Sequence, residues 1–294
     1  MNNLYKYFTP IITECNRGKL NRGLLLGGWI LYKKVFNEFD NNLIVVDEYK
    51  FSNDLYNPYK YLYNICKKVD YPIILGGDTT VASSSVLSSV NKYRDNLTLI
   101  WIDSKPNLNT IISSPTKYTN ETTLSLILGY ENEAYRYIKE KYNKVRNSKN
   151  VSEEEKHFYF SYNDYYKTYL WTKSLYYFLS STNMIYLGIR DFDDYEEKLI
   201  YDVKIKVLET KDIINFIKKT DNKIHITFNI NSVDPYYIDS TENNIHNGLE
   251  INDVRRVIDI SLDEKKLVGL DIVEFNPQLG DIDKSINSMK NIFG

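Results

Sequence analysis

Cysteine and histidine are scarce in this chain, which has two of the first and three of the second among 294 residues. Cys15 and Cys66 are too few for a disulfide framework, so we expect a reducing compartment and a cytoplasmic location. The longest apolar run, near Leu24 to Tyr32, is shorter than the roughly 20 residues of a membrane span. The opening residues, MNNLYKYFTP, lack the order of a secretory signal. A net charge of −2 excludes an overall field that recruits nucleic acid or an anionic membrane.

Short apolar segments rich in β-branched residues recur along the chain. Seven are strand candidates: Asn42–Val46, Pro72–Leu75, Leu97–Ile102, Met184–Ile189, Val203–Leu208, Lys223–Ile230 and Leu267–Glu274. Amphipathic segments with helical spacing lie between them, at Thr80–Tyr93, Lys211–Lys219 and Asn252–Ser261. Strands that are apolar throughout are covered on both faces. The alternation therefore predicts an α/β fold with a mainly parallel sheet between layers of helices.

One stretch departs from this alternation. Tyr130–Phe178 is polar and aromatic, mostly helical in pattern, and contains the charged segment Lys144–Lys156. We interpret it as an enlarged surface insertion (residues 130–178) within a single domain that spans residues 1–294. The alternative is an interaction surface, since loops often carry function and Tyr and Trp are favoured at interfaces.

Four segments each end a predicted strand and continue into polar residues. They are IILGGDTT (Ile73–Thr80), LIWIDSKPNLNT (Leu99–Thr110), ITFNINSVDP (Ile226–Pro235) and GLDIVEFNP (Gly269–Pro277). Ligands of an open parallel sheet bind beyond the carboxyl ends of its strands, so we expect these segments to converge on one rim.

These four segments, in this order, resemble the signature motifs of the ureohydrolases of the arginase family. The family motifs are GGDH, then D-A-H-x-D after "W-I/V", then S-F-D-x-D-x-x-D-P, and finally G-L-D-I-x-E-x-N-P. A further segment, YLGIRDFDDYEE (Tyr186–Glu197), is similar to the family's I-G-L-R-D-x-D. The resemblance implies a three-layer α/β/α fold with a mostly parallel sheet of about eight strands. It also implies a homo-oligomer, either a trimer or a hexamer.

The resemblance further implies a site for two Mn²⁺ ions, held by two histidines and four aspartates. In the first motif the histidine is replaced by Thr79. In the second motif Asp103 is retained, but the histidine is replaced by Lys105 and the last aspartate by Asn107.

The third motif is also changed, because both of its aspartates are replaced, by Asn229 and Asn231. The histidine that resembles a proton shuttle in the family's substrate loop aligns with Asn120. One metal ligand, Asp103, therefore remains of the implied set.

The chemistry of these replacements argues against manganese. Mn²⁺ prefers carboxylate, imidazole and water ligands, and the ammonium of Lys105 repels a divalent cation. We expect Lys105 to neutralise Asp103 instead. Water without a metal keeps a high pKa and is a poor nucleophile. The sequence thus predicts no metal cofactor, no catalytic residue and a catalytically inactive arginase-like protein that acts through binding or assembly, although residual hydrolase activity stays open.

Three acids remain as candidates for ligand binding. The resemblance places Glu274 against the guanidinium or amine of the substrate, and it places Asp193 and Glu196 at the substrate's amino end. The alternative for Glu274 is a carboxylate that pairs at the end of a strand. For Asp193 and Glu196 it is a solvated acidic turn, DFDDYEE.

The histidines share no common spacing that favours a metal or catalytic role. His225 alternates with the apolar face of a strand and is expected in the core. His246 precedes Gly248 and is expected near the rim, while His157 falls in the insertion.

Two other functions remain open. The first is an enzyme of the same fold with altered or metal-independent chemistry on a guanidino or amino substrate. The second is a sensor of a basic amino acid or polyamine. The expected partners are a second copy of the chain, another protein or a small cationic ligand, and neither nucleic acid nor a membrane.

Overall fold

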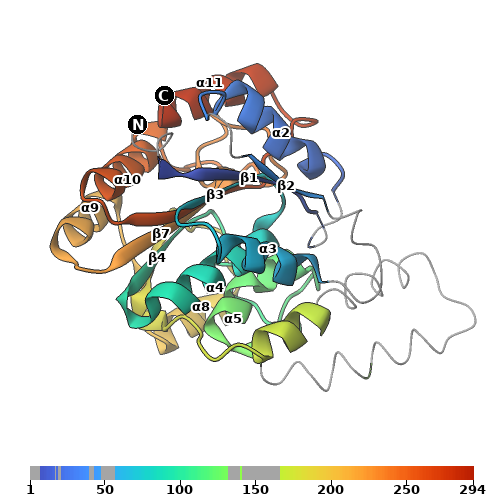
Figure 1. Cartoon of the computed structure of the whole chain (residues 1–294), viewed down its shortest axis with the longest axis vertical. Coiled ribbons are helices and arrows are strands. Elements are labelled where there is room, and N and C mark those ends of the chain that lie inside the picture. The colour runs from blue at the N-terminus through green and yellow to red at the C-terminus, as the bar shows by residue number, and fades with distance from the viewer. Residues whose placement is uncertain are drawn as a thin grey trace, which may run out of the picture.

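The computed structural model describes residues 7–16, 18, 21–39, 43–47, 57–131, 140 and 166–294. Its centre is a sheet of eight strands in the order β2-β1-β3-β8-β7-β4-β5-β6 (Figure 1). The strands are β1 (Thr9–Glu14), β2 (Ile44–Asp47), β3 (Pro72–Leu75), β4 (Leu97–Ile102), β5 (Met184–Leu187), β6 (Lys206–Val207), β7 (Lys223–Asn229) and β8 (Leu267–Val273). Every neighbouring pair is parallel.

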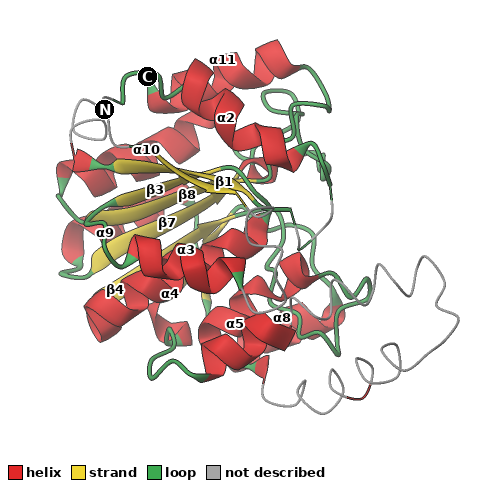
Figure 2. Ribbon diagram, turned by 45° about the vertical axis from the view of Figure 1, so that its right-hand side comes forward, coloured by secondary structure: helices red, strands yellow, loops and turns green. Residues whose placement is uncertain are grey.

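Helices cover both faces of the sheet (Figure 2). One face packs against α2 (Leu24–Lys34), α9 (Thr210–Lys219), α10 (Ile251–Asp263) and α11 (Ile282–Phe293). The other face packs against α3 (Pro58–Cys66), α4 (Ala82–Tyr93) and α5 (Thr123–Leu128), with α8 (Asp194–Asp202) alongside. Each face has its own cluster of buried apolar side chains, because successive residues of a strand point to opposite sides. The predicted three-layer fold with about eight strands is confirmed.

Short polar side chains start several of the helices. Asp193 accepts a hydrogen bond from the main-chain N–H of Glu196 at the start of α8, and Asp281 accepts one from Lys284 at the start of α11. Asn57 does the same for α3. Such caps satisfy N–H groups that lack a partner within the helix, and they fix where each helix begins.

The structure differs from the sequence prediction at several elements. The strand β1 (Thr9–Glu14) and the helices α2, α3, α5, α8 and α11 were not among the predicted segments, and the predicted strand Val203–Leu208 is reduced to Lys206–Val207. The last difference arises because α8 continues to Asp202 and Lys204 then turns in the left-handed region at φ 59°. Of the predicted insertion 130–178, residues 132–139 and 141–165, including the charged segment Lys144–Lys156, lie outside the described residues.

None of the described helices combines the length and the apolar character that a membrane span requires.

Candidate functional site

The four polar segments lie beyond four adjacent strands of the sheet. They follow β3, β8, β7 and β4, which are consecutive neighbours in its centre. All the strands are parallel, so their carboxyl ends share one edge, and the structure brings the four segments together there as predicted.

Two glycines let the chain turn sharply after β3. Gly76 and Gly77 have φ values of 85° and 84°, which side chains of L-residues rarely adopt. A Cβ atom on Gly76 would lie 2.4 Å from the main-chain nitrogen of Gly28. This close approach requires glycine, and it places Asp78 and Thr79 beneath the rim.

Asp103 is the hub of a buried hydrogen-bond network at this edge. Its side chain is fully buried. Its Oδ1 accepts from the main-chain N–H of Lys105 at 3.0 Å, and its Oδ2 accepts from the amides of Asn107 at 2.7 Å and Asn229 at 2.9 Å. The pKa of Asp103 is raised to about 7, with burial as the largest cause. The nearby Glu274 also raises this pKa, and the hydrogen bonds to Asp103 lower it.

Glu274 stands next to this network and is held through one of its two oxygens. Its Oε1 accepts from both the main-chain N–H and the hydroxyl of Thr79, each at 2.8 Å. No hydrogen bond from a described residue reaches its Oε2. Glu274 also has a left-handed backbone, at φ 67°. Such a conformation costs about 1–3 kcal/mol, and Asn107, at φ 53°, is the other residue of the cavity walls that adopts it among those described.

A cavity of about 160 Å³ opens above this network. Each residue that lines it has a polar or charged side chain: Thr79, Lys105, Asn107, Thr116, Tyr118, Asn120, Glu121, Asn229, Asn231, Asn243 and Glu274. We call it the inner cavity. It brings together the predicted positions that replace metal ligands, and Asp103 lies beneath its floor, hydrogen-bonded to two of the lining amides.

Asn120 is the residue that aligns with the family's proton-shuttle histidine, and it lies in the wall of the inner cavity. Its side-chain Oδ1 is buried and accepts no hydrogen bond from the described residues. A buried amide oxygen without a donor is costly, so this residue of the cavity wall stands out from the satisfied amides of Asn229 and Asn231.

A second cavity of about 180 Å³ lies beside the first, and Lys105, Asn107 and Glu121 line both. Its wall also contains Asp191, Asp193 and Glu196. We call it the outer cavity.

Two of the predicted ligand-binding acids in the outer cavity also have structural partners. Asp193 caps α8 and accepts from the amide of Asn109 at 2.8 Å. Glu196 accepts from the main-chain N–H of Leu108 at 2.9 Å, and burial raises its pKa to about 7. The alternative of a solvated turn is therefore wrong for Glu196, which is only 6% exposed.

Lys105 does not neutralise Asp103, which corrects the prediction from the sequence. Its ammonium lies 3.2 Å from Asp191 Oδ2, and the two side chains are 32% and 49% exposed. Three N–H donors already occupy the oxygens of Asp103. Both partners of the pair with Asp191 keep contact with solvent, so this pairing avoids most of the cost of burying an ammonium.

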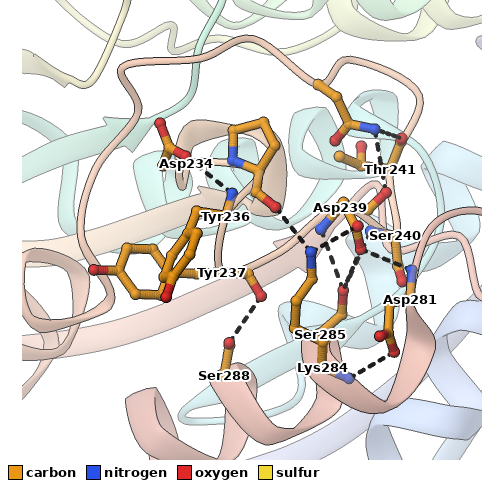
Figure 3. Close-up of polar contacts among 12 residues, drawn as sticks. Asp234, Tyr236, Tyr237, Asp239, Ser240, Thr241, Asp281, Lys284, Ser285 and Ser288 are labelled. Carbon is orange, nitrogen blue, oxygen red and sulfur yellow. Dashed lines mark hydrogen bonds and ion pairs between the residues drawn. The ribbon is translucent and has the colours of Figure 1, made fainter.

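The loop after β7 carries Asn243 to the inner cavity, and it is anchored to α11 (Figure 3). Lys284 Nζ donates to the main-chain oxygen of Pro235 at 3.0 Å and to Asp239 Oδ2 at 2.7 Å. Ser288 Oγ donates to the main-chain oxygen of Tyr237 at 2.8 Å. The sequence analysis did not find Asn243 or Glu121, because neither belongs to a motif.

The two described histidines, His225 and His246, line neither cavity. His225 is fully buried between Ser89 and Asp271, as expected for a core residue. His246 contributes its main-chain oxygen to Arg190 but lines neither cavity. His157 lies outside the described residues.

The residues at the rim do not fit the manganese pair that the resemblance implies. Across the described part of the chain, no three His, Cys, Asp or Glu side chains come together in a way that could hold a metal ion. Asp103 and Glu274 are the carboxylates at the centre, and amides and a hydroxyl occupy the other positions. Two Mn²⁺ ions require several anionic or imidazole ligands, so this donor set is unsuited to them.

Both a protein-family model and individual proteins of known name are similar to this chain. The family model described as "Arginase family" matches residues 34–292. The arginase of Plasmodium falciparum is 26% identical over 290 residues, which cover 89% of this chain and 62% of that protein. The arginase of Plasmodium berghei is 29% identical over 234 residues, which cover 75% of this chain and 57% of that protein. The chain thus matches only part of the length of these relatives.

Solved structures show the same fold. The arginase of Entamoeba histolytica in complex with L-ornithine superposes with a TM-score of 0.73 and 19% identity, covering 98% of each chain. The arginase of Bacillus subtilis gives a TM-score of 0.70 at 18% identity, covering 97% of this chain and 96% of that one.

These comparisons overturn the interpretation that the chain is not an enzyme. The two relatives described above are named arginases, and so are the two solved structures. That interpretation took the loss of metal ligands for a loss of catalysis, which does not follow, because a changed ligand set is also compatible with changed chemistry.

Proposed function

Since this chain belongs to the arginase family, we propose that it is an enzyme whose two rim cavities bind a basic compound with a guanidinium or ammonium group. Glu274 Oε2 faces the cationic group of the substrate in the inner cavity. The observation that carries this proposal is the geometry of Glu274, which is fixed by Thr79 through one oxygen while the other receives no donor from the described residues.

The polarity of the inner cavity favours a cation rich in N–H groups. Glu274 Oε2 and Asn120 Oδ1 are acceptors without a described donor, and Glu121 adds a second carboxylate to the wall. Lys105 is the one cationic residue in that wall, and its charge is directed to Asp191. A guanidinium offers several donors in one plane, and an ammonium offers three, so both match such a wall.

The outer cavity is suited to the other end of the same compound. Asp191, Asp193, Glu196 and Glu121 line it, against the single ammonium of Lys105. An excess of acidic side chains favours a second positive group there, such as the α-ammonium of a basic amino acid or the far amine of a polyamine. The shared wall of Lys105, Asn107 and Glu121 makes the two cavities neighbours, so one extended molecule can reach both.

Calorimetry with matched ligands tests the proposal. Arginine and citrulline have the same shape, but citrulline has no charge on its side chain. We expect arginine, agmatine or ornithine to bind at least about 10-fold more tightly than citrulline, which corresponds to about 1.4 kcal/mol. Equal binding of arginine and citrulline would show that no acidic group recognises the side chain.

The variant Glu274→Gln isolates the carboxylate. An amide at this position still accepts from Thr79 through its oxygen, so the fold is expected to persist while binding of the cation weakens. Glu250→Gln is the matched control, because Glu250 is exposed and its side chain makes no cap hydrogen bond. The control should bind like the parent protein.

Turnover is measured on the same samples by following loss of the guanidino compound and release of urea. A sensor of basic amino acids or polyamines is the second candidate function, supported by the same acidic cavities. Binding without any turnover would favour it. Assembly into a trimer or hexamer remains a prediction, and light scattering of the purified chain tests it.

A further inference from the structure

The network around Asp103 reverses the polarity that a metal site requires. A metal ion is surrounded by lone pairs, whereas Asp103 is surrounded by N–H groups. The donors come from Lys105, Asn107 and Asn229, three positions where the family resemblance places metal ligands. The retained aspartate has become the acceptor at the centre of a ring of donors.

The orientation of each amide follows from its other contacts. Asn229 Oδ1 accepts from the main-chain N–H of Asn231 at 3.1 Å, so its amide nitrogen is the atom that faces Asp103. Asn107 Nδ2 lies between Asp103 Oδ2 and the main-chain oxygen of Lys105, and both of these atoms are acceptors. Neither amide can be reversed without placing two acceptors against each other.

The third amide is fixed in the same way. Asn231 Oδ1 accepts from the main-chain N–H of Ser104 at 3.1 Å. Thr79 donates its hydroxyl hydrogen to Glu274 and accepts from Asn229 Nδ2 at 3.2 Å. The oxygens of Asn229 and Asn231 are thus occupied by main-chain donors, and a protonated amide nitrogen is not a metal ligand. Asp103, Asn107, Asn229 and Asn231 are each at least 96% buried, so solvent does not compete for these contacts.

We propose that this centre takes no divalent metal, and that the amide hydrogens of Asn107 and Asn229 hold Asp103 in the place of cations. The amides satisfy the carboxylate in the same way that a metal would, with partial positive charge directed at its oxygens. The centre is therefore assembled by folding alone, and the cavity above it keeps its shape without manganese.

Thermal unfolding of the purified chain tests this proposal with a readout other than activity. We expect the Tm to be the same, to within about 1 °C, with Mn²⁺, with EDTA and with neither, because a ligand that does not bind the native state does not stabilise it. Elemental analysis after dialysis against Mn²⁺ should find no stoichiometric metal. A clear rise of the Tm with Mn²⁺ that is lost in Asp103→Asn would overturn the proposal.

The double variant Asn107→Asp/Asn229→Asp tests the role of the amides. It places three carboxylates together, so we expect a lower Tm in EDTA and a recovery of several degrees with Mn²⁺. The matched control is Asn91→Asp/Asn287→Asp, which adds the same charge at two exposed positions and should not respond to Mn²⁺. A folded double variant that ignores Mn²⁺ would refute the assignment of metal exclusion to the amides. If the double variant does not fold, Asn229→Asp alone is judged by the same measurement.

Discussion

Two buried aspartates, one within β8 and one just beyond β4, lie on either side of β7 and have different surroundings. Asp271 lies within β8 and accepts from Thr227 Oγ1 at 2.9 Å, and its Oδ2 lies 3.0 Å from His225 Nε2. His225 in turn lies 2.8 Å from Ser89 Oγ. Asp103, just beyond β4, is surrounded by main-chain and side-chain amides. Both aspartates are fully buried.

The two networks differ in the groups that surround the aspartate and in whether they border a cavity. The core network contains the imidazole of His225, and its residues line neither cavity. The rim network contains neutral donors only, it has Glu274 beside it, and it borders a cavity. In the core network His225 and Thr227 both contact Asp271 Oδ2, whereas the rim network borders a cavity in which a ligand can offset its negative charge.

The largest effect should follow from breaking the core network. Asp271→Ala leaves His225, Thr227 and Ser89 with an incomplete buried network, and we expect a loss of about 3–5 kcal/mol in the free energy of unfolding. Urea denaturation measures this loss, and Asp271→Asn is the milder control that keeps one acceptor oxygen. A loss below about 1 kcal/mol in Asp271→Ala would mean that the two networks do not differ in this respect.

The rim should make stability depend on pH. Burial raises the pKa of Asp78, Asp103 and Glu196 to about 7, with Glu274 adding to the rise for the first two. An acid whose pKa is higher in the folded state stabilises the fold when protonated. This stability is fully present below the unfolded pKa of about 4 and is lost as the pH rises through about 7. We therefore expect the free energy of unfolding to fall between pH 5 and pH 8.

Asp103→Asn connects this pH dependence to a single residue. The variant removes one titrating group, so we expect a flatter decline, and because its NH2 group then faces an N–H donor we also expect a loss of about 1–3 kcal/mol at pH 7. It should also weaken binding of a cationic ligand, because the negative charge under the inner cavity is smaller. If the decline with pH stays as steep as in the parent chain, Asp103 does not titrate in this range.

Local patterns were sufficient for the parallel sheet and for the meeting of the four polar segments at its rim, whereas the number of strands was implied by the family resemblance. Continuous apolar strands and polar residues at their ends predicted the parallel sheet and its rim. The helix α2 was missed since Leu24–Lys34 is apolar on several sides and contains Gly27, where a Cβ would lie 2.1 Å from the oxygen of Phe275. That close contact involves residues about 250 positions apart in the chain, so no local pattern could reveal it.

The partner of Lys105 was beyond the sequence for a related reason. A lysine side chain is long and flexible, and several carboxylates lie within its reach at the rim. Which carboxylate pairs with Lys105 depends on which carboxylate oxygens already accept other hydrogen bonds and on how exposed each carboxylate is to solvent. At Asp103 three N–H donors had taken these places, which only the folded structure shows.

The smallest effect concerns Lys105 itself. Its ion pair with Asp191 is partly exposed, so Lys105→Ala should cost less than about 1 kcal/mol, in contrast to Asp271→Ala. Lys105 lines both cavities, and its removal leaves Asp191 without its ammonium partner. The cavities then become more acidic, and we expect a basic ligand to bind about two- to tenfold more tightly at low salt, with the gain shrinking as salt screens it. Lys198→Ala, on the surface of α8, is the control for a lost surface charge. Calorimetry at two salt concentrations measures the affinity of the parent chain and of both variants for the basic ligand. Weaker binding in Lys105→Ala would contradict the prediction, because it would mean that the ammonium of Lys105 itself contacts the ligand, for example through a carboxylate of the ligand.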